Sequence, residues 1–410
     1  MIKHIIKIIF NERKANAWIF LELLIVSFCT WIMVYGLYTS YVFYNQPTDL
    51  NVENVYRIKW GILDPNSNEY DTSDEMRQMS VRLQLMGLKD VISHYKGVEA
   101  VTLSYFGAPY TGSNIGDKYE VDSVNFSFAE SRIVSEEYPL VYRMKGKSST
   151  SEELSQILKE DKLIISNKLS NKFFGDEPVV GARLTCQGHE ALLGDVLETS
   201  RYEETKEMGC IVYSLLGDID SWAMSSSFSL EFRVRDNEVE GFVERFREDM
   251  EQMRYGNLFV SDISSMEDIR DTFHRNLYVD HKSKYGIIAF LLVNVFIGII
   301  GTFWYRTEQR KREMGLRMAI GSTRNHLRYI LFSEGLLILL LSYILTLILS
   351  ANFYFFKINL AGVDSEISIA RFFIAHAIVF ALMAIMIVLG IYMPSKTTTK
   401  LNPAEVLHAE

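Results

Sequence analysis

The sequence lacks the motifs of the common nucleotide-binding and hydrolytic enzymes. Its 410 residues contain no G-x-x-x-x-G-K-[ST] loop, no H-E-x-x-H pair and no G-x-S-x-G turn. A P-loop, a zinc-protease helix of that type and a serine-hydrolase elbow are therefore excluded. Cysteine is scarce as well, with three residues, which excludes a disulfide-dense scaffold. We expect no catalytic residue, no metal and no cofactor in this chain.

Charged residues are absent from long stretches of the sequence. Four segments are long and apolar enough to cross a hydrocarbon core that is about 30 Å thick: Trp18–Tyr44, Tyr285–Tyr305, Tyr329–Phe356 and Phe372–Pro394. The first contains only Glu22 and the third only Glu334, while the other two contain no Asp, Glu, Lys or Arg. The first run is much longer than the core of a signal peptide, so we interpret it as an uncleaved anchor.

Short basic flanks predict the orientation of these helices. Lys and Arg gather in the first 16 residues and in the segment 306–328, which carries seven of them. Short loops rich in Lys and Arg stay in the cytoplasm. We therefore expect both termini and residues 306–328 inside, and residues 45–284 and 357–371 outside, in a multi-pass protein of the cytoplasmic membrane.

These spans divide the chain into the following predicted parts. They are an amphipathic N-terminal helix (1–16), a first membrane helix with an outer stalk (17–44), an exported domain (45–284), three further membrane helices (285–305, 329–356 and 372–394), a cytoplasmic loop (306–328), a short outer loop (357–371) and a tail (395–410).

The exported domain has the pattern of an α+β fold. Strands are predicted at Val55–Trp60, Val98–Phe106, Phe228–Val234 and Asn257–Ile263, and helices at Asp74–Lys96 and Glu238–Met253. Two such β-α-β units predict one split subdomain (about 50–110 and 225–264) with a second subdomain inserted at about 110–225. Residues 265–284 are then a returning stalk helix, on which we expect His274 and His281 to be exposed to solvent.

The exported domain is acidic, with 42 Asp and Glu against 27 Lys and Arg. Nucleic-acid phosphates require a basic surface, so nucleic acid is excluded as a partner.

Two stretches resemble a known family. Residues 310–324 read Arg-Lys-Arg-Glu-Met-Gly-Leu-Arg-Met-Ala-Ile-Gly-Ser-Thr-Arg and precede a membrane helix with an early Glu334. This resembles the signature of FtsX-like permeases. Residues 163–181, from Leu-Ile-Ile-Ser through Phe-Phe-Gly-Asp to a glycine, look like the periplasmic core of MacB-type permeases. With one helix, a large exported domain and three more helices, the resemblance covers the whole chain.

The resemblance implies a permease subunit of the type VII ABC class. Such a subunit pairs with a second permease copy or paralogue, rests on separate cytoplasmic ATPase subunits that hold ATP and Mg, and transmits force to its periplasmic domain. A periplasmic adaptor, an outer-membrane channel and membrane lipids are further partners that it implies. Export of a substrate, release of lipoproteins and activation of cell-wall hydrolases stay open. A membrane-anchored ligand sensor is the alternative from another class.

The resemblance also implies that the loop 306–328 docks the ATPase. Its candidate residues are Arg310, Arg312, Glu313, Gly315, Leu316, Arg317 and Gly321. From the residues alone, a helix that stops at Gly321 and a second helix capped by Ser322 or Thr323 predict a rigid elbow. The basic residues also suit contact with anionic lipid headgroups.

Several polar residues in apolar surroundings have more than one explanation. Glu22 and Glu334 could snorkel, pair with a nearby Arg or contact the elbow, and Gly298 and Gly301 could allow close helix packing. Cys29 is expected to pack within its helix. Cys186 and Cys210 could form a disulfide if the domain is exported, and with His189 they offer three zinc ligands where a structural site takes four.

Overall fold

The structure is a computed structural model that consists of two compact units. The first comprises residues Met1–Val42 and Leu277–Glu410, and the second comprises residues Phe43–Asn276. It describes residues 13–48, 50–121, 125–175, 177–199, 201, 204, 209–309, 314, 316–318, 320–356 and 368–398. The predicted N-terminal helix 1–16, the outer loop 357–371 and the tail 395–410 lie mostly or entirely outside the described residues.

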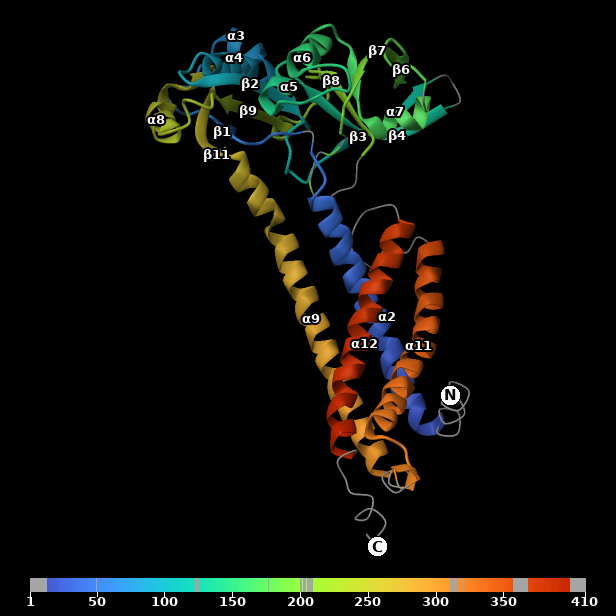
Figure 1. The fold of residues 1–410 in the computed structure, drawn as a ribbon. Coiled ribbons are helices and arrows are strands. Elements are labelled where there is room, and N and C mark those ends of the chain that lie inside the picture. Colours follow the sequence, from blue (N-terminus) through green and yellow to red (C-terminus); the bar gives the residue numbers. More distant parts are fainter. Residues whose placement is uncertain are drawn as a thin grey trace. The chain divides into compact units, whose positions relative to one another are not determined.

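The first unit contains four long helices (Figure 1): α2 (Arg13–Tyr44), α9 (Met266–Gln309), α11 (Arg324–Phe355) and α12 (Ile369–Thr398). Each is long and apolar enough to cross a membrane. The 44 residues of α9 span about 66 Å, more than twice the thickness of a hydrocarbon core. It therefore extends well beyond its apolar part, as the predicted stalk requires.

Buried apolar side chains from all four helices form the core of this unit. They include Leu23 of α2, Val295 of α9, Leu339 of α11 and Met383 of α12. Many other large apolar side chains are exposed on the same helices, such as Phe290 and Ile297. Such an exposed apolar surface is what a lipid-facing helix requires. The four membrane helices predicted from the sequence are thus present.

The second unit is an α/β domain whose strands all belong to one hydrogen-bonded sheet. The strands are β1 (Val55–Ile62), β2 (Val98–Tyr105), β3 (Ile115–Val121), β4 (Asn125–Val134), β5 (Leu163–Ile165), β6 (Arg183–Cys186), β7 (His189–Val196), β8 (Ile211–Leu215), β9 (Phe228–Val234), β10 (Arg254–Tyr255) and β11 (Leu258–Ser265). Their order is β10-β11-β1-β9-β2-β4-β3-β6-β7-β5-β8. The helices are α3 (Asp74–Gln78), α4 (Val81–Ser93), α5 (Tyr138–Tyr142), α6 (Ser151–Lys159), α7 (Asn167–Phe174) and α8 (Phe242–Asp249), with short 3-10 turns at Ser225–Ser227 and Met250–Gln252.

The strands of the two flanking segments lie side by side. β1 and β2 come from the first segment and β9 and β11 from the second, and they pair antiparallel in the order β11-β1-β9-β2. One face of these strands packs against α4 and α8 through side chains such as Leu88, Phe232 and Phe246. This is the arrangement that the two β-α-β units predict.

The predicted helices of this half are shorter than the periodicity indicated. The segment Asp74–Lys96 contains two helices, α3 and α4, because Met79 is extended and the hydroxyl of Ser80 accepts a hydrogen bond from Leu83 N–H as a new N-cap. The segment Glu238–Met253 is helical only from Phe242, because Gly241 before it adopts a left-handed conformation with φ of 65°.

The inserted segment forms a closed barrel of six strands. Around the ring the order is β4-β3-β6-β7-β5-β8, and β8 pairs back to β4 in parallel. Buried side chains from all six strands, among them Tyr119, Ala129, Leu184 and Val212, form one apolar cluster that fills it. Short pairing between β2 and β4 joins the barrel to the rest of the sheet. Closure removes the exposed edges that an open sheet of this size would present.

The stretch that resembled the MacB core builds part of this barrel. β5 is followed by Ser166, whose hydroxyl caps α7 by accepting a hydrogen bond from Leu169 N–H. α7 ends at Gly175, which has a φ of 58°, and Gly181 with a φ of 86° precedes β6. Positive φ angles at these positions explain why both are glycine.

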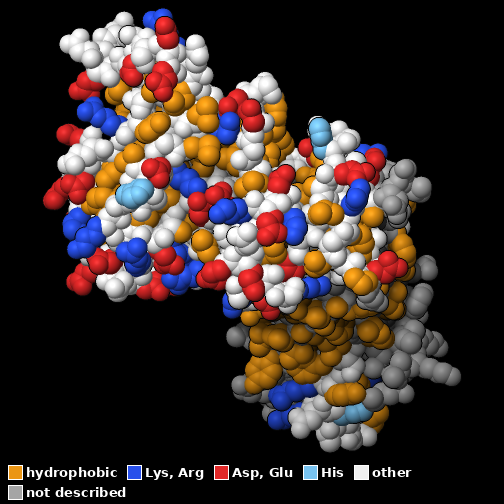
Figure 2. Space-filling view, turned by 90° about the horizontal axis from the view of Figure 1, so that it is seen from above, with side chains coloured by type: hydrophobic (Ala, Val, Ile, Leu, Met, Phe, Trp, Pro, Cys, Tyr) orange, Lys and Arg blue, Asp and Glu red, His pale blue; other side chains and the backbone are white. Residues whose placement is uncertain are grey.

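Charged side chains of both signs alternate over the visible face of the domain (Figure 2). The acidic residues are thus interspersed with basic ones on this face.

Candidate functional site

The segment between α9 and α11 contains a tight helix stop. Ser322 N–H donates a hydrogen bond to the Arg317 carbonyl (2.9 Å) and Gly321 N–H donates to the Met318 carbonyl (3.1 Å). This pair of bonds is the Schellman motif, which ends a helix with a residue in left-handed conformation. Gly321 has a φ of 104°, which a side chain would strain. The helix therefore stops at Gly321, as its glycine predicts.

The next helix, α11, begins three residues later, at Arg324. Thr323 Oγ1 accepts a hydrogen bond from His326 N–H (3.2 Å), and the Thr323 carbonyl accepts one from Leu327 N–H (3.2 Å). Thr323 is thus the N-cap of α11, and of the two candidate caps it is the one used. Because both ends are closed by backbone bonds, the turn at residues 320–323 is a defined corner. We call this turn, together with the helical residues before it (Met314 and Leu316–Met318) and the first two turns of α11, the elbow.

One side of the elbow is anchored in the helical core. Met314, Leu327 and Leu331 are buried in the cluster formed by the four long helices, and Met318 packs against it. The other side presents two apolar side chains to the exterior: Leu316 is 54% exposed and Ile320 is 78% exposed. Residues four apart lie next to each other on a helix surface. The elbow thus combines a fixed base with an exposed apolar pair.

Of the remaining predicted residues of the loop 306–328, the structure describes only Arg317. Arg310, Arg312, Glu313 and Gly315 lie outside the described residues. Arg317 is described and half-buried, and its carbonyl belongs to the helix stop.

The carboxylate of Glu22 lies against Gly298. A Cβ placed on Gly298 would lie 2.5 Å from Glu22 Oε1 and 2.9 Å from Oε2. The glycine therefore provides the space that lets α2 bring a carboxylate close to α9. Gly301, one turn further along α9, has nothing within 4 Å of such a Cβ. Of the two glycines expected to allow close packing, only Gly298 faces another helix.

This difference predicts a result for a matched pair of variants. Gly298→Val should lower the melting temperature of the purified chain by a few degrees, because the added carbons overlap the Glu22 carboxylate and force that side chain into another rotamer, at a cost of about 0.5–1.5 kcal/mol. Gly301→Val, on the same helix, should leave the melting temperature within about 1 °C of the original. Thermal unfolding in mild detergent measures both. Equal effects of the two substitutions would contradict the proposed contact.

Glu334 differs from Glu22 in its exposure. Glu334 is buried and belongs to α11, whereas Glu22 is half-buried. The next residue, Gly335, lies close to the side chains of Ile391 and Phe303, so this part of α11 packs against α12 and α9. The two carboxylates that look equivalent in the sequence thus have different surroundings.

Sequence reasoning missed one buried polar residue of the helical unit, His376. It lies on α12 with 3% of its surface exposed, and its ring contacts Tyr343, Ser350 and Trp31. The available signal was a single histidine in an apolar run that contains no Asp, Glu, Lys or Arg.

The disulfide that Cys186 and Cys210 could have formed is absent from the structure, in which both thiols are free. Cys186 ends β6 and Cys210 directly precedes β8, and these strands are three steps apart in either direction around the six-stranded ring. They therefore lie on opposite sides of the barrel, beyond the reach of a disulfide. Burial raises the pKa of the Cys186 thiol to about 11.

The described residues contain no cluster of three or more His, Cys, Asp or Glu side chains that could hold a metal ion. Cys186, His189 and Cys210 are therefore not brought together as a zinc site.

His274 was expected to be exposed on the stalk, and this was wrong. Only 1% of its surface is exposed, and its Nε2 lies 3.5 Å from Glu204 Oε2. The ring also packs edge-on against Tyr44 and Tyr110. The first turns of α9 thus belong to the core of the domain, where buried Met266 sits as well.

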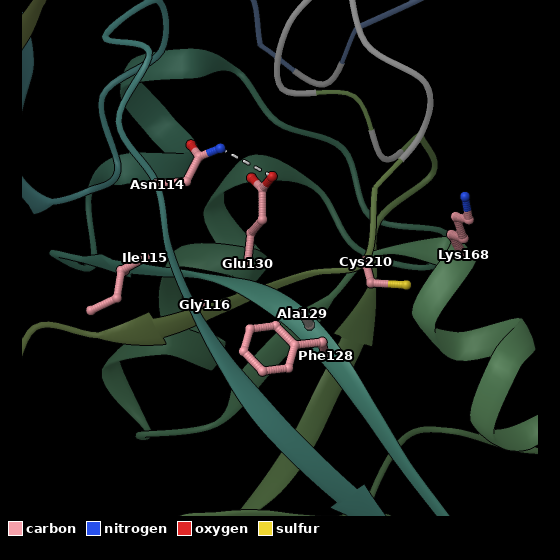
Figure 3. A pocket seen from close by; sticks show the side chains of 8 residues that line it. All are labelled: Asn114, Ile115, Gly116, Phe128, Ala129, Glu130, Lys168 and Cys210. Atoms are coloured by element: carbon pink, nitrogen blue, oxygen red, sulfur yellow. Dashed lines mark hydrogen bonds between the residues drawn. The ribbon is translucent and has the colours of Figure 1, made fainter. Parts of the chain in front are cut away.

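A pocket of about 410 Å³ opens on the barrel (Figure 3). It is lined by Asn114, Ile115, Gly116, Phe128, Ala129, Glu130, Lys168 and Cys210. Asn114 Nδ2 donates a hydrogen bond to Glu130 Oε1 (3.2 Å), and Phe128 is largely exposed. The pocket is shallow and combines one acidic and one basic side chain, so it does not define a ligand class.

The comparison with protein families identifies the helical part. Residues 285–403 match the model of the FtsX-like permease C-terminal region. This part of the chain is thus similar to the C-terminal region of the FtsX-like permeases. The match includes the elbow, the part of α9 from residue 285 onward, α11 and α12. Among curated proteins, none matches the chain.

Solved structures resemble the other part of the chain. The periplasmic region of MacB from Actinobacillus actinomycetemcomitans is 11% identical, with a TM-score of 0.33, over 55% of this chain and 94% of that one. A permease domain from Porphyromonas gingivalis is 15% identical, with a TM-score of 0.34, over 50% and 83%. The extracellular domain of the ABC-type transporter YknZ from Gram-positive bacteria is 14% identical, with a TM-score of 0.30, over 50% and 100%. At these scores the likeness itself supports no statement about activity.

Proposed function

We propose that this chain is the force-transmitting permease subunit of an ABC transporter. It would work with a separate ATPase that docks on the elbow, and with a second permease subunit, while ATP and Mg stay on the ATPase. The observation that carries the proposal is the elbow itself. Within the region that matches the FtsX-like permeases, a corner closed at both ends presents Leu316 and Ile320 outward and is anchored to the helical core.

The direction of this coupling follows from the chain path. α9 runs without interruption from the end of β11 in the α/β domain to the segment before the elbow. A continuous helix transmits a displacement along its axis better than a jointed one, since each of its turns is held by backbone bonds. We infer that movement of the docked ATPase reaches the α/β domain through α9.

The proposed setting is the cytoplasmic membrane, with the elbow inside and the α/β domain outside. The Lys and Arg residues of 306–328 support this orientation. Within this setting we propose export of a substrate from the outer side of the membrane. Lipoprotein release and activation of a cell-wall hydrolase are the alternatives, because both would use the same coupling between an ATPase and the α/β domain.

Co-purification tests the proposal. The tagged full chain, extracted from its own cells in mild detergent, should elute with an ABC-type ATPase in near-stoichiometric amount, identified by mass spectrometry. The eluted complex should hydrolyse ATP, whereas the chain stripped of its partner should not. Elution of the chain with no ATPase, under conditions in which an unrelated ABC transporter keeps its own, would rule the proposal out and favour a membrane-anchored sensor.

A further inference from the structure

His376 is an ionisable side chain enclosed by three membrane helices. It lies on α12, is 3% exposed, and is contacted by α11 and α2. Ionisable residues are rare inside membrane bundles because burying a charge there is costly, and those that occur usually have a function. None of the groups used in the proposed coupling contacts this ring, so its role is a separate question.

Both ring nitrogens of His376 contact hydroxyl groups of α11. Nδ1 lies 3.1 Å from the Tyr343 hydroxyl, and Nε2 lies 2.9 Å from Ser350 Oγ. Each hydroxyl also contacts a backbone carbonyl: Tyr343 O–H donates to the His376 carbonyl (2.7 Å), and Ser350 Oγ lies 3.0 Å from the Leu347 carbonyl. The ring therefore has a partner on each side, and each partner has a second acceptor within reach.

The positions of the hydrogens follow from these contacts. Because Tyr343 donates its proton to a carbonyl, its oxygen can only accept from the ring, so Nδ1 carries a proton. Ser350 has two choices. It can donate to Nε2, which fits a neutral ring, or it can donate to the Leu347 carbonyl and accept from a protonated Nε2, which fits a charged ring. Rotation of one hydroxyl exchanges these states without moving a heavy atom.

The surroundings of the ring also suit a positive charge. Trp31 of α2 stacks on the imidazole at 5.1 Å between ring centroids with an angle of 11° between planes. The face of an indole ring attracts a cation, and this attraction is strongest where water is excluded. Phe372 and Tyr343 pack edge-on at 4.5 and 5.7 Å. This aromatic enclosure offsets part of the cost of removing the charge from water.

Other ionisable groups of the three helices lie further away. Tyr35 of α2 packs against Trp31, and Arg371 precedes His376 by five residues on α12. The acids Glu22 and Glu334 each lie nine residues, or about 14 Å along the helix, from the ring partners Trp31 and Tyr343. No carboxylate among the described residues contacts the ring. The polar groups that contact the ring are thus the hydroxyls of Tyr343 and Ser350.

We propose that His376 is a proton-binding site within the membrane bundle. A proton adds to Nε2, the lone pair of that nitrogen forms the new N–H bond, and the hydroxyl proton of Ser350 turns to the Leu347 carbonyl. The charged ring then holds α11 through two donated hydrogen bonds and α2 through Trp31. Protonation therefore tightens the contact of α12 with both helices.

Nitrogen NMR of the full chain in lipid nanodiscs tests the proposal. With the histidine rings labelled with ¹⁵N and the His376 signals assigned by their loss in His376→Gln, the spectrum shows whether one or both nitrogens are protonated. We expect one protonated nitrogen at about pH 8 and two at about pH 4, because a ring removed from water gains its charge less readily than an exposed histidine. A ring that keeps one protonation state over this whole range would overturn the proposal, and it would leave His376 as a structural residue.

Two serine variants separate the proton site from general packing. Ser350→Ala removes the acceptor of Nε2–H and should move the transition to lower pH by about one unit, the size of one hydrogen bond to a charged group. Ser342→Ala removes an equally buried hydroxyl of α11 that bonds to the Leu339 carbonyl, and it should leave the transition unchanged. Equal shifts in both variants would contradict the assigned role of Ser350.

Fluorescence provides a second readout that does not depend on activity. A protonated imidazole stacked on Trp31 should quench its emission, so the chain should lose intensity reversibly as the pH falls. Trp31→Phe and His376→Gln should each remove this component, while the other four tryptophans supply the unchanged background. A pH-dependent component that persists in either variant would exclude the stacked pair as its source.

Discussion

Ile320→Asp should reduce the amount of ATPase that co-purifies with the chain by a factor of ten or more. Ile320 is the most exposed apolar side chain of the elbow, at 78%, and in the proposed complex a partner covers it. A buried carboxylate without a partner costs at least about 2 kcal/mol at such a contact, which is more than tenfold in affinity. The free chain should fold normally, because the substituted side chain faces outward.

Matched substitutions show whether the effect belongs to the elbow. Ile320→Leu keeps an apolar side chain of the same size and should retain the ATPase. Leu83→Asp places the same charge on α4 of the α/β domain, where Leu83 is 42% exposed, and should also retain it. If Ile320→Asp keeps its full complement of ATPase, the elbow is not the docking surface, although the chain could still bind an ATPase elsewhere.

Arg233→Leu should lower the melting temperature of the chain by about 10 °C or prevent folding of the α/β domain. Arg233 is fully buried, and its guanidinium donates hydrogen bonds to the carbonyls of Val141 (2.6 Å), Glu53 (2.8 Å) and Asn51 (2.7 Å). Leucine would leave these carbonyls buried without a donor, at a cost of about 3–5 kcal/mol. Burial lowers the pKa of this guanidinium to about 10, so it remains charged at neutral pH.

Exposed Arg235, two residues along the same segment, supplies the control. Arg235→Leu should change the melting temperature by no more than about 1–2 °C. Arg233→Lys should lie between the two, because one ammonium cannot reach three carbonyls with the geometry of the planar guanidinium. Thermal unfolding of the full chain in detergent, followed by near-ultraviolet circular dichroism, measures all three. A melting temperature of Arg233→Leu that matches that of Arg235→Leu would refute the bracing role.

The burial of Arg233 could not be predicted from the alternating pattern of β9. Along β9 the side chains of Leu230, Phe232 and Val234 belong to the apolar cluster under α4 and α8, and the alternation of a strand puts Glu231 and Arg233 on the opposite face. An alternating strand normally exposes its polar face to water. Here the face is covered, and Arg57 pairs with the buried Glu231 at 3.2 Å. Burial raises the pKa of Glu231, while the neighbouring Arg57 acts against this.

Backbone angles and helix caps, which depend on neighbouring residues, determined much of the elbow and of the start of α7. Gly321 is required by a positive φ, Thr323 by an orphan backbone N–H at the start of α11, and Ser166 by the same need at the start of α7. The sequence predicted the stop at Gly321 and a cap at Ser322 or Thr323, because these features depend on residues within a few positions of each other. The cap at Ser166 has the same local origin but was not predicted.

Contacts between distant residues had to come from the tertiary structure. The free Cys186 and Cys210, the buried His274, the closed ring of six strands and the environment of His376 depend on segments that are far apart in the chain. Their pairing is set by which strand or helix lies alongside, and no local spacing encodes that. The sequence by itself determined four apolar helices, an α/β domain and a capped elbow, because each follows from periodicity, composition or a special backbone angle. The tertiary structure decided which of the remaining polar side chains became buried, and therefore which of them are available for function.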